Sequence, residues 1–343
     1  MSSETTGSDQ VKRPEHFRVA AVQAAPVYMD RDATAEKAYR LVEEAARQGA
    51  EIVGFPECFI PGFPSWVYAA SPNYDTVKAF RDYVENSVAV PSRITDDLQE
   101  IARRNKINVV MGMVERDPAV ESALYISQLF VGEEGLILGK HRKIVPTYAE
   151  KLLFTSGDGS TLSVFKTRYG ELGGLNCGEH FNPLARFALI AQNIKVHVAS
   201  WPMPSVEWMD SISPCVRSYA YEAAAYVINS SGVVTPEIRE ELLRYAGSAR
   251  QAYEPHATTG GGVSCIINPF GKVIAQANPD REEIVYAECD ISEHYRAKAS
   301  HDVVGNYNRP DIFSLTINKR PFKLVTTIDE EAAAEKDHYV QMT

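Results

Sequence analysis

One cysteine of this chain stands where a reactive thiol would be placed. Cys177 follows a short apolar run at 172–175, and a segment with helical character at 182–192 comes soon after it. A turn from strand to helix presents backbone N–H groups, which together with the helix dipole favour a thiolate. We therefore expect Cys177 to be a nucleophile, provided that the chain also supplies a base and a cation.

Two charged residues that follow other predicted strands could supply them. Glu57 comes directly after the strand at 51–55, beside apolar residues that should desolvate its carboxylate and raise its pKa. Lys143 ends a basic run and borders an apolar stretch, so its ammonium group could point inward. The carboxylate would take the thiol proton, the sulfur would attack an electrophilic carbon, and the ammonium would stabilise the charge that develops.

Composition is that of an ordinary globular protein. The 343 residues are 45% hydrophobic and 23% charged, and the net charge is −10, so we expect no nucleic acid or anionic membrane as partner. A membrane-spanning helix needs about 18 or more consecutive apolar residues, and no apolar run in this sequence is that long. The five cysteines lack CxxC spacing and the histidines lack HxH or HExxH spacing, so we expect neither disulfides nor a metal site.

The predicted elements alternate between strands and helices, which indicates an α/β fold with some antiparallel hairpins. Strands are predicted at 17–25, 51–55, 108–115, 125–131, 136–141, 195–200, 226–230, 262–268, 272–277 and 283–290. Helices are predicted at 32–48, 76–87, 96–104, 182–192 and 211–225, with Asp32 or Thr34 capping the first. We predict one catalytic domain at 17–320, between a disordered leader at 1–16 and a tail at 321–343.

Several other polar residues have structural explanations. Lys140 and Arg142 are expected to form a basic surface turn, and His197 is expected to be a satisfied core histidine rather than a ligand. The remaining cysteines are expected to be buried packing residues. They are Cys58, Cys215, Cys265 and Cys289, of which Cys58 could line the site because it adjoins Glu57.

The sequence motifs around Glu57, Lys143 and Cys177 resemble, in type and order, those of the nitrilase branch of the carbon–nitrogen hydrolase superfamily. The matching stretches span about residues 17–315 and are 55–57 with 61–64, 140–147 with Glu150, 157–160, 176–180 with 183–184, and 305–311. The resemblance implies a four-layer αββα sandwich with a Glu–Lys–Cys triad at one end of the sheets. It implies that Glu57 is the general base, Lys143 the cationic stabiliser and Cys177 the nucleophile. Glu150 matches a second glutamate that positions the lysine and water.

The resemblance also implies roles for residues around the nucleophile. Glu179 matches a further acidic position with a supporting role, and the backbone N–H of Gly178 is a natural second oxyanion donor beside Lys143. We place His180 and Trp201 with them in the expected substrate pocket. An aromatic and apolar lining of this pocket would suit an uncharged nitrile with a hydrophobic substituent.

Two residues depart from the family pattern without touching the triad. Gly178 stands where nitrilases usually have Trp, which would either open the pocket or leave a gap that a neighbour such as Trp201 fills. Asn306 stands where nitrilases commonly have His, in a segment that packs near the active site in relatives.

The reaction that the resemblance implies is hydrolysis of an organic nitrile to a carboxylic acid and ammonia. It would pass through a cysteine thioimidate and an acyl-enzyme and would require no metal or organic cofactor. The alternatives are an amidase or a cyanide hydratase or dihydratase of the same superfamily, and a non-catalytic scaffold on the same fold. A small-molecule substrate, a cytoplasmic location and a homo-oligomer built from dimers, which in relatives extend into spirals, complete the expectation.

Overall fold

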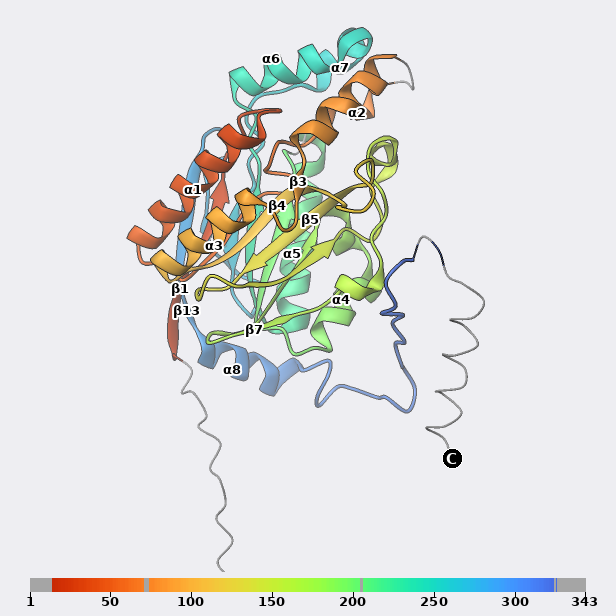
Figure 1. Ribbon diagram of the computed structural model, residues 1–343. Coiled ribbons are helices and arrows are strands. Elements are labelled where there is room, and N and C mark those ends of the chain that lie inside the picture. The colour runs from red at the N-terminus through yellow and green to blue at the C-terminus, as the bar shows by residue number, and fades with distance from the viewer. Residues whose placement is uncertain (1–13, 71–73, 204–205, 324, 326–343) are drawn as a thin grey trace, which may run out of the picture.

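The computed structural model describes residues 14–70, 74–203, 206–323 and 325. Most of the leader predicted at 1–16 and of the tail predicted at 321–343 therefore lies outside the described residues. Within them, two mixed β-sheets lie face to face, with helices on their outer faces (Figure 1). After the last helix, the chain runs on as an extended segment along the outside of the molecule (Figure 1).

The first sheet has the strand order β13-β1-β2-β4-β5-β6, and β3 pairs with β4 beside this path. Its strands are β1 His16–Gln23, β2 Ile52–Gly54, β3 Val88–Ala89, β4 Asn108–Arg116, β5 Leu124–Val131, β6 Ile137–Arg142 and β13 Glu283–Asp290. Strands β1, β2 and β4 run parallel, whereas β13, β5 and β6 pair antiparallel with their neighbours. The predicted β5–β6 hairpin is confirmed.

The second sheet has the order β12-β11-β10-β9-β8-β7, with a parallel centre and antiparallel edges. Its strands are β7 Phe165–Thr167, β8 Gly170–Asn176, β9 Val196–Trp201, β10 Tyr226–Ser231, β11 Cys265–Ile267 and β12 Val273–Gln276. The parallel strands β8, β9 and β10 are buried along nearly their whole length. Such strands need a layer on each side of the sheet.

The helices are α1 Arg31–Arg47, α2 Tyr74–Asn86, α3 Arg93–Asn105, α4 Pro183–Ile190, α5 Val206–Ala223, α6 Pro236–Tyr245, α7 Arg250–Tyr253 and α8 Ile291–His301. Helices α6, α7 and α8 were not among the predicted elements. The predicted cap of α1 is wrong, because Asp30 in extended conformation accepts the Ala33 N–H. Thr34 instead donates its hydroxyl to the Val27 carbonyl. Among the described helices, none is long and apolar enough to cross a membrane.

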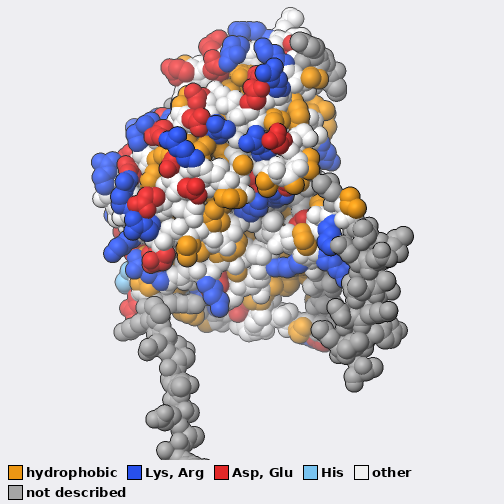
Figure 2. All heavy atoms as spheres, in the orientation of Figure 1, with side chains coloured by type: hydrophobic (Ala, Val, Ile, Leu, Met, Phe, Trp, Pro, Cys, Tyr) orange, Lys and Arg blue, Asp and Glu red, His pale blue; other side chains and the backbone are white. Residues whose placement is uncertain are grey.

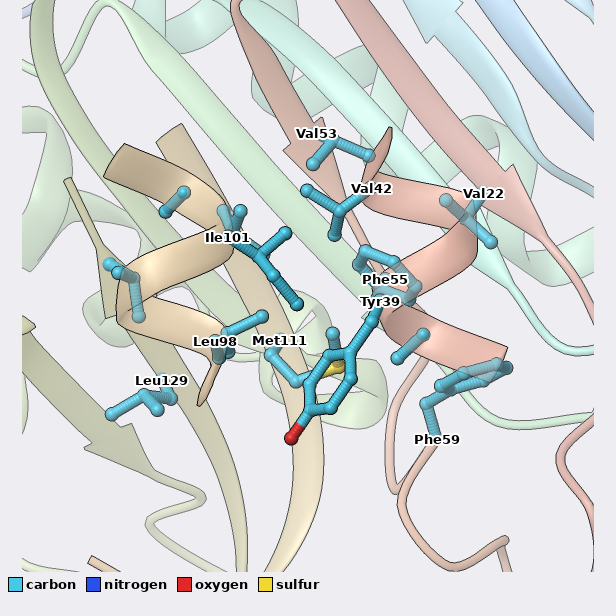
Figure 3. Packing of buried hydrophobic residues seen from close by; sticks show 14 of the residues in the cluster. Val22, Tyr39, Val42, Val53, Phe55, Phe59, Leu98, Ile101, Met111 and Leu129 are labelled. Atoms are coloured by element: carbon cyan, nitrogen blue, oxygen red, sulfur yellow. The ribbon is translucent and has the colours of Figure 1, made fainter. Parts of the chain in front are cut away.

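Three apolar layers hold these elements together and confirm the αββα arrangement. Helices α1 and α3 cover the outer face of the first sheet, where Tyr39 and Ile101 pack over Val53 and Met111 (Figure 3). A second cluster, with residues such as Val110, joins the inner faces of the two sheets. A third cluster packs α4 and α5 on the outer face of the second sheet. The face seen in Figure 2 carries acidic and basic side chains close together.

Polar contacts between the sheets fix the strand ends where the candidate residues lie. The Gln128 amide of β5 donates to the Val198 carbonyl at 3.1 Å and to the Ser200 hydroxyl at 2.8 Å, both on β9. The Ser200 hydroxyl donates in turn to the carbonyl of Phe55, just after β2. The Glu57 N–H donates to the Trp201 carbonyl at 3.0 Å. The ends of β2 and β9 are therefore held in register across the interface between the sheets.

The absence of a side chain at Gly112 lets the segment that carries Glu57 lie directly on β4. A Cβ atom at position 112 would be 1.8 Å from the Pro56 carbonyl oxygen and 3.1 Å from the Glu57 Cα. The Ile60 N–H donates to the Gly112 carbonyl, and the Val114 N–H donates to the Ile60 carbonyl. This close approach fixes the height of Glu57 above the sheet.

Gly112→Ala is therefore expected to displace the 56–60 segment and to lower the free energy of unfolding by about 1–3 kcal/mol, the usual cost of overpacking. Gly132→Ala is the matched control, because a Cβ there would meet only the flexible Leu138 side chain, at 3.1 Å. Urea denaturation of both variants measures the difference. Equal losses of stability would contradict the close contact at Gly112.

Candidate active site

A lysine that is buried between two carboxylates forms the centre of the site. Lys143 follows β6, and its side chain is 0% exposed, as are those of its two partners. Its ammonium donates to Glu57 Oε1 at 2.9 Å and to Glu150 Oε2 at 2.8 Å. Burial alone would lower the pKa of Lys143, but the neighbouring acidic groups outweigh it and hold the pKa well above the usual value. The lysine is therefore a fixed positive charge.

The two glutamates differ in how their oxygens are occupied. Glu150 accepts hydrogen bonds on both oxygens, from the Tyr68 hydroxyl at 3.1 Å on one and from Lys143 and the Thr147 N–H on the other. Glu57 Oε2 is buried and has no hydrogen-bond partner among the described residues. Burial raises the pKa of Glu57 to about 8, against the opposing effect of Lys143. Glu57 therefore has a free oxygen that can take a proton, as a general base requires.

Cys177 begins a short 3-10 helix, η4 Cys177–Phe181, at the end of β8. Its φ of +45° is left-handed, an uncommon conformation for a residue with a side chain. Burial raises the pKa of the thiol, while Lys143 and a hydrogen bond from the Gly178 N–H lower it. The expectation that the helix dipole favours a thiolate is wrong, because burial dominates and α4 begins only at Pro183. The resting sulfur therefore carries its proton.

Glu179 joins the loop that carries the lysine to the loop that carries the cysteine. One carboxylate oxygen accepts the Ile144 N–H at 2.9 Å, and the other accepts the Asn176 N–H at 2.8 Å. These donors adjoin Lys143 and Cys177 in the chain. Glu179 therefore sets the separation between ammonium and sulfur without lining the substrate cavity.

His141 completes this connection as the cationic partner of Glu179. Its Nε2 lies 2.9 Å from Glu179 Oε2, and both side chains are almost fully buried. Burial acts to lower the pKa of His141, but the Glu179 carboxylate raises it above its ordinary value. Burial acts to raise the pKa of Glu179, but His141 and the backbone N–H donors bring it below its ordinary value. The two side chains therefore form a buried ion pair.

His180 and Trp201 differ in their position relative to the cavity. Trp201 is buried and lines the cavity beside Cys177. His180 is also buried but lies behind the nucleophile, stacked on Trp201 with ring centroids 5.2 Å apart. Like Glu179, it is not one of the residues that line the cavity. The sequence placed all of these residues in one pocket, whereas the structure places Glu179 and His180 in the layer that supports it.

A cavity of about 730 Å³ opens above Cys177 and Gly178. Its walls are mainly aromatic and aliphatic, and among the described residues none that lines it is acidic or is a lysine or arginine. The lining residues are Phe63, Ser65, Tyr68, Ala69, Thr147, Tyr148, Cys177, Gly178, Phe181, Trp201, Pro202, Met203, Ile212, Val234, Ala252, Tyr253, His256, Ala257 and Thr258. Such a cavity suits an uncharged, largely apolar molecule. Within the described ranges, no group of three or more His, Cys, Asp or Glu side chains could hold a metal ion.

The two departures from the family pattern have different surroundings. A Cβ atom at Gly178 would lie 3.2 Å from Thr147 Oγ1 and 3.6 Å from the ring of Phe181. Phe181 is therefore the nearest aromatic side chain to this position. Asn306 is exposed, accepts the Asp302 N–H and does not line the cavity.

Residues with predicted structural roles are mostly where we expected them. His197 is buried in the core, as predicted, but the prediction that it is fully satisfied is wrong, because its Nδ1 has no hydrogen-bond partner among the described residues. Cys58 is buried without lining the cavity. The predicted surface turn at Lys140 and Arg142 is wrong. Both lie on β6 and pair with the buried Glu115, which would otherwise be an unpaired charge.

Comparison with known proteins gives consistent matches over most of the chain. The sequence profile described as Carbon-nitrogen hydrolase matches residues 18–299. An aliphatic nitrilase of Rhodococcus rhodochrous is 38% identical, over 91% of this chain and 85% of the relative. An arylacetonitrilase of Aspergillus kawachii is 35% identical, over 94% of this chain and 98% of the relative.

Solved structures extend this likeness to the fold. Nit3 of Saccharomyces cerevisiae, a member of branch 10 of the nitrilase superfamily, has a TM-score of 0.69 at 22% identity, over 87% of this chain and 98% of its own. An amidase from Nesterenkonia sp. has a TM-score of 0.62 at 17% identity, over 89% of this chain and 98% of its own. At these identities, the likeness concerns the fold alone.

Glu179→Gln is expected to lower the free energy of unfolding by about 3–5 kcal/mol, because it removes one partner of a buried ion pair. The pKa of Glu179 is below its ordinary 4.5 and that of His141 is above its ordinary 6.5. The pair therefore contributes fully between these pH values. Its contribution is lost as the pH falls through the lowered pKa of Glu179 or rises through the raised pKa of His141.

Urea denaturation measures this contribution between about pH 4 and pH 9, a range that includes the ordinary pKa values of both glutamate and histidine. Glu85→Gln is the control, because its ion pair with Arg81 is exposed and should not affect the unfolding midpoint. If Glu179→Gln were no more destabilising than Glu85→Gln near pH 5.5 (roughly midway between the two ordinary values), the buried ion pair of Glu179 and His141 would not stabilise the fold.

Proposed function

The chain belongs to the carbon–nitrogen hydrolase family, and on this premise we propose that it is a nitrilase acting through Glu57, Lys143 and Cys177. It hydrolyses an organic nitrile to the carboxylic acid and ammonia. The observation that carries the proposal is the buried Glu57–Lys143–Glu150 cluster, whose charges act on Cys177, the one thiol in the described part of the chain that lines the apolar cavity. The nitrilases among the similar proteins support the same reaction.

The first step is addition of the Cys177 thiol to the nitrile carbon. Because the resting thiol is protonated, the free Oε2 of Glu57 takes its proton as the carbon–sulfur bond forms. Negative charge develops on the nitrile nitrogen, where the Lys143 ammonium and the Gly178 N–H stabilise it. Glu57 passes the thiol proton to that nitrogen, which restores the free carboxylate and gives a thioimidate in which the substrate carbon is bonded to sulfur. Glu150 has both oxygens occupied, which suits a positioning role rather than that of the base.

Two molecules of water complete the reaction. The first gives a proton to Glu57 as its oxygen adds to the thioimidate carbon, and Glu57 passes that proton to the nitrogen. The hydroxyl proton of the tetrahedral intermediate then moves to the nitrogen as the carbon–nitrogen bond breaks, which releases ammonia and leaves a thioester. The second water adds to the thioester, and the carbon–sulfur bond breaks to release the acid and restore the thiol. If the first tetrahedral intermediate expels sulfur instead of ammonia, the product is an amide. Lys143 and the Gly178 N–H stabilise the oxyanion of the thioester-hydrolysis step.

The cavity supports a nitrile with a hydrophobic substituent, because its walls are mainly aromatic and aliphatic and the described part of its lining carries no acidic, lysine or arginine side chain. We also propose, on the family resemblance alone, that the chain forms a dimer-based homo-oligomer and works in the cytoplasm. A single-chain particle mass in light scattering would contradict the first of these two proposals.

The proposed reaction predicts ammonia release from organic nitriles that depends on Cys177. We would assay a panel of aliphatic, arylaliphatic and aromatic nitriles, with cyanide and the matched amides. The wild-type chain is expected to release ammonia and acid from organic nitriles, and Cys177→Ala is expected to lower kcat by at least about 10³-fold, since the nucleophile is removed. Cys289→Ala removes a buried thiol of β13 that lies outside the cavity and should retain turnover.

The other outcomes separate the alternatives. Turnover of amides alone, or of cyanide alone, would contradict the nitrilase and support a neighbouring branch of the family. Absence of any turnover by the folded wild-type chain would favour the non-catalytic scaffold.

A further inference from the structure

The peptide group between Cys177 and Gly178 is held through its carbonyl. Its carbonyl oxygen accepts a hydrogen bond from His180 Nδ1 at 2.8 Å, and its N–H lies close enough to the sulfur to lower the pKa of the Cys177 thiol. In a trans peptide, the N–H and the carbonyl point in opposite directions within one plane. A side chain that fixes the direction of the carbonyl therefore also fixes the direction of the N–H. Here that N–H is the proposed oxyanion donor.

A second histidine determines which nitrogen of His180 carries the proton. Because the Cys177 carbonyl can only accept, His180 Nδ1 must be the donor, and His180 Nε2 is then an acceptor if the ring is neutral. His197 Nε2 lies 2.9 Å from His180 Nε2, so it supplies the hydrogen. Burial lowers the pKa of His180 to about 4 and that of His197 well below its usual value, which keeps both rings neutral. The hydrogen bonds thus run from His197 through His180 to the peptide.

The arrangement is costly if its only role is packing. Both imidazoles are 0% exposed, and His197 Nδ1 and the neighbouring Tyr219 hydroxyl are buried without a hydrogen-bond partner in the described part of the chain. Unpaired buried polar groups destabilise a fold, and aliphatic side chains would fill the same space at lower cost. Neither histidine lines the cavity, so neither can bind substrate directly.

Neighbouring groups hold the two rings rigidly. The His180 ring is stacked on Trp201, and the His197 ring lies 4.2 Å from that of Tyr219. The Cys215 thiol donates to the His180 carbonyl at 2.9 Å. The backbone of Cys177 is left-handed, so without such support its peptide group would relax towards commoner conformations.

We propose that His180 and His197 are positioning residues of the oxyanion site: His197 fixes the tautomer of His180, and His180 holds the Cys177–Gly178 peptide with its N–H aimed at the developing charge. This inference rests on the proposed nitrile hydrolysis. It adds two residues that act through the backbone rather than on the substrate. Hydrogen bonding to the carbonyl also polarises the peptide group and so strengthens its N–H as a donor.

The test compares variants that keep or remove each donor. His180→Asn can place an amide N–H near the position of Nδ1, whereas His180→Leu cannot. His180→Leu is expected to lower kcat by about 10²–10³-fold, the loss found when one oxyanion donor is removed, with KM changed by less than about threefold. The kcat of His180→Asn should be at least about tenfold higher than that of His180→Leu. In the same way, His197→Gln, which keeps a donor near Nε2, should exceed His197→Leu in kcat.

Two further measurements distinguish oxyanion positioning from general damage. An aldehyde analogue of a substrate nitrile forms a thiohemiacetal with Cys177, and its oxygen needs the same N–H. Its inhibition constant should therefore rise in His180→Leu by about the factor by which kcat falls, as expected for a transition-state analogue. Alkylation of Cys177 by iodoacetamide develops no oxyanion. The alkylation rate of His180→Leu should therefore differ from that of the wild-type chain by less than about threefold.

Three outcomes would overturn the proposal. They are an unchanged kcat in folded His180→Leu, an alkylation rate that falls in parallel with kcat, and a His180→Asn that is no better than His180→Leu. If His180→Leu does not fold, the His197→Gln and His197→Leu pair decides by the same readouts. If the wild-type chain hydrolyses no nitrile, the proposed function fails, whereas the aldehyde and alkylation measurements still report on the peptide.

Discussion

An ammonium group that is cut off from water must be neutralised by the protein, and this requirement organises the candidate site. Moving an isolated charge from water to a protein interior costs several kcal/mol or more even after relaxation, so Lys143 can stay charged only if carboxylates approach it closely. Glu57 and Glu150 do so from two different segments. The fold must therefore bring the end of β2 to the loop after β6. The inter-sheet contacts of Gln128 and Ser200 and the close approach at Gly112 serve this placement.

The same constraint separates the functions of the acidic side chains. With one lysine between two buried carboxylates, the cluster holds more negative than positive charge when both are ionised, and proton uptake by Glu57 relieves that excess. Its free oxygen makes the uptake possible next to the sulfur. Glu179 lies one layer further out and is neutralised by His141. Electrostatic neutralisation in the core and proton transfer in the reaction thus depend on the same few groups.

Chain order put Glu57, Lys143 and Cys177 near the ends of predicted strands, but only the resemblance to the nitrilase branch predicted that the three residues form one cluster. The α/β class followed from the alternation of strands and helices, whereas the two-sheet sandwich was implied by the resemblance. The range of β13 was predicted residue for residue. Helix α6 was missed although Thr235 and Pro236 are ordinary signals of a helix start. His141 also had a signal, since side chains two apart on a strand share a face and Lys143 points inward.

Other features depend on contacts that one sequence does not reveal. The protonation of Cys177 follows from how deeply the fold buries it, and burial outweighed the nearby N–H groups and cation. Likewise, the link from His197 through His180 joins η4 to β9, and no spacing along the chain predicts a hydrogen bond between them. The pairing of Lys140 and Arg142 with Glu115 joins strands in the same way.

The central claim, covalent catalysis by Cys177, is tested most directly by mass spectrometry of the enzyme during nitrile turnover. After rapid acid quench and proteolysis, the peptide that contains Cys177 should carry the added mass of the nitrile or of the corresponding acyl group. Peptides that contain the other cysteines should remain unmodified. Steady release of acid and ammonia with no adduct on Cys177 at any quench time, although a model thioester survives the same quench, would contradict the account.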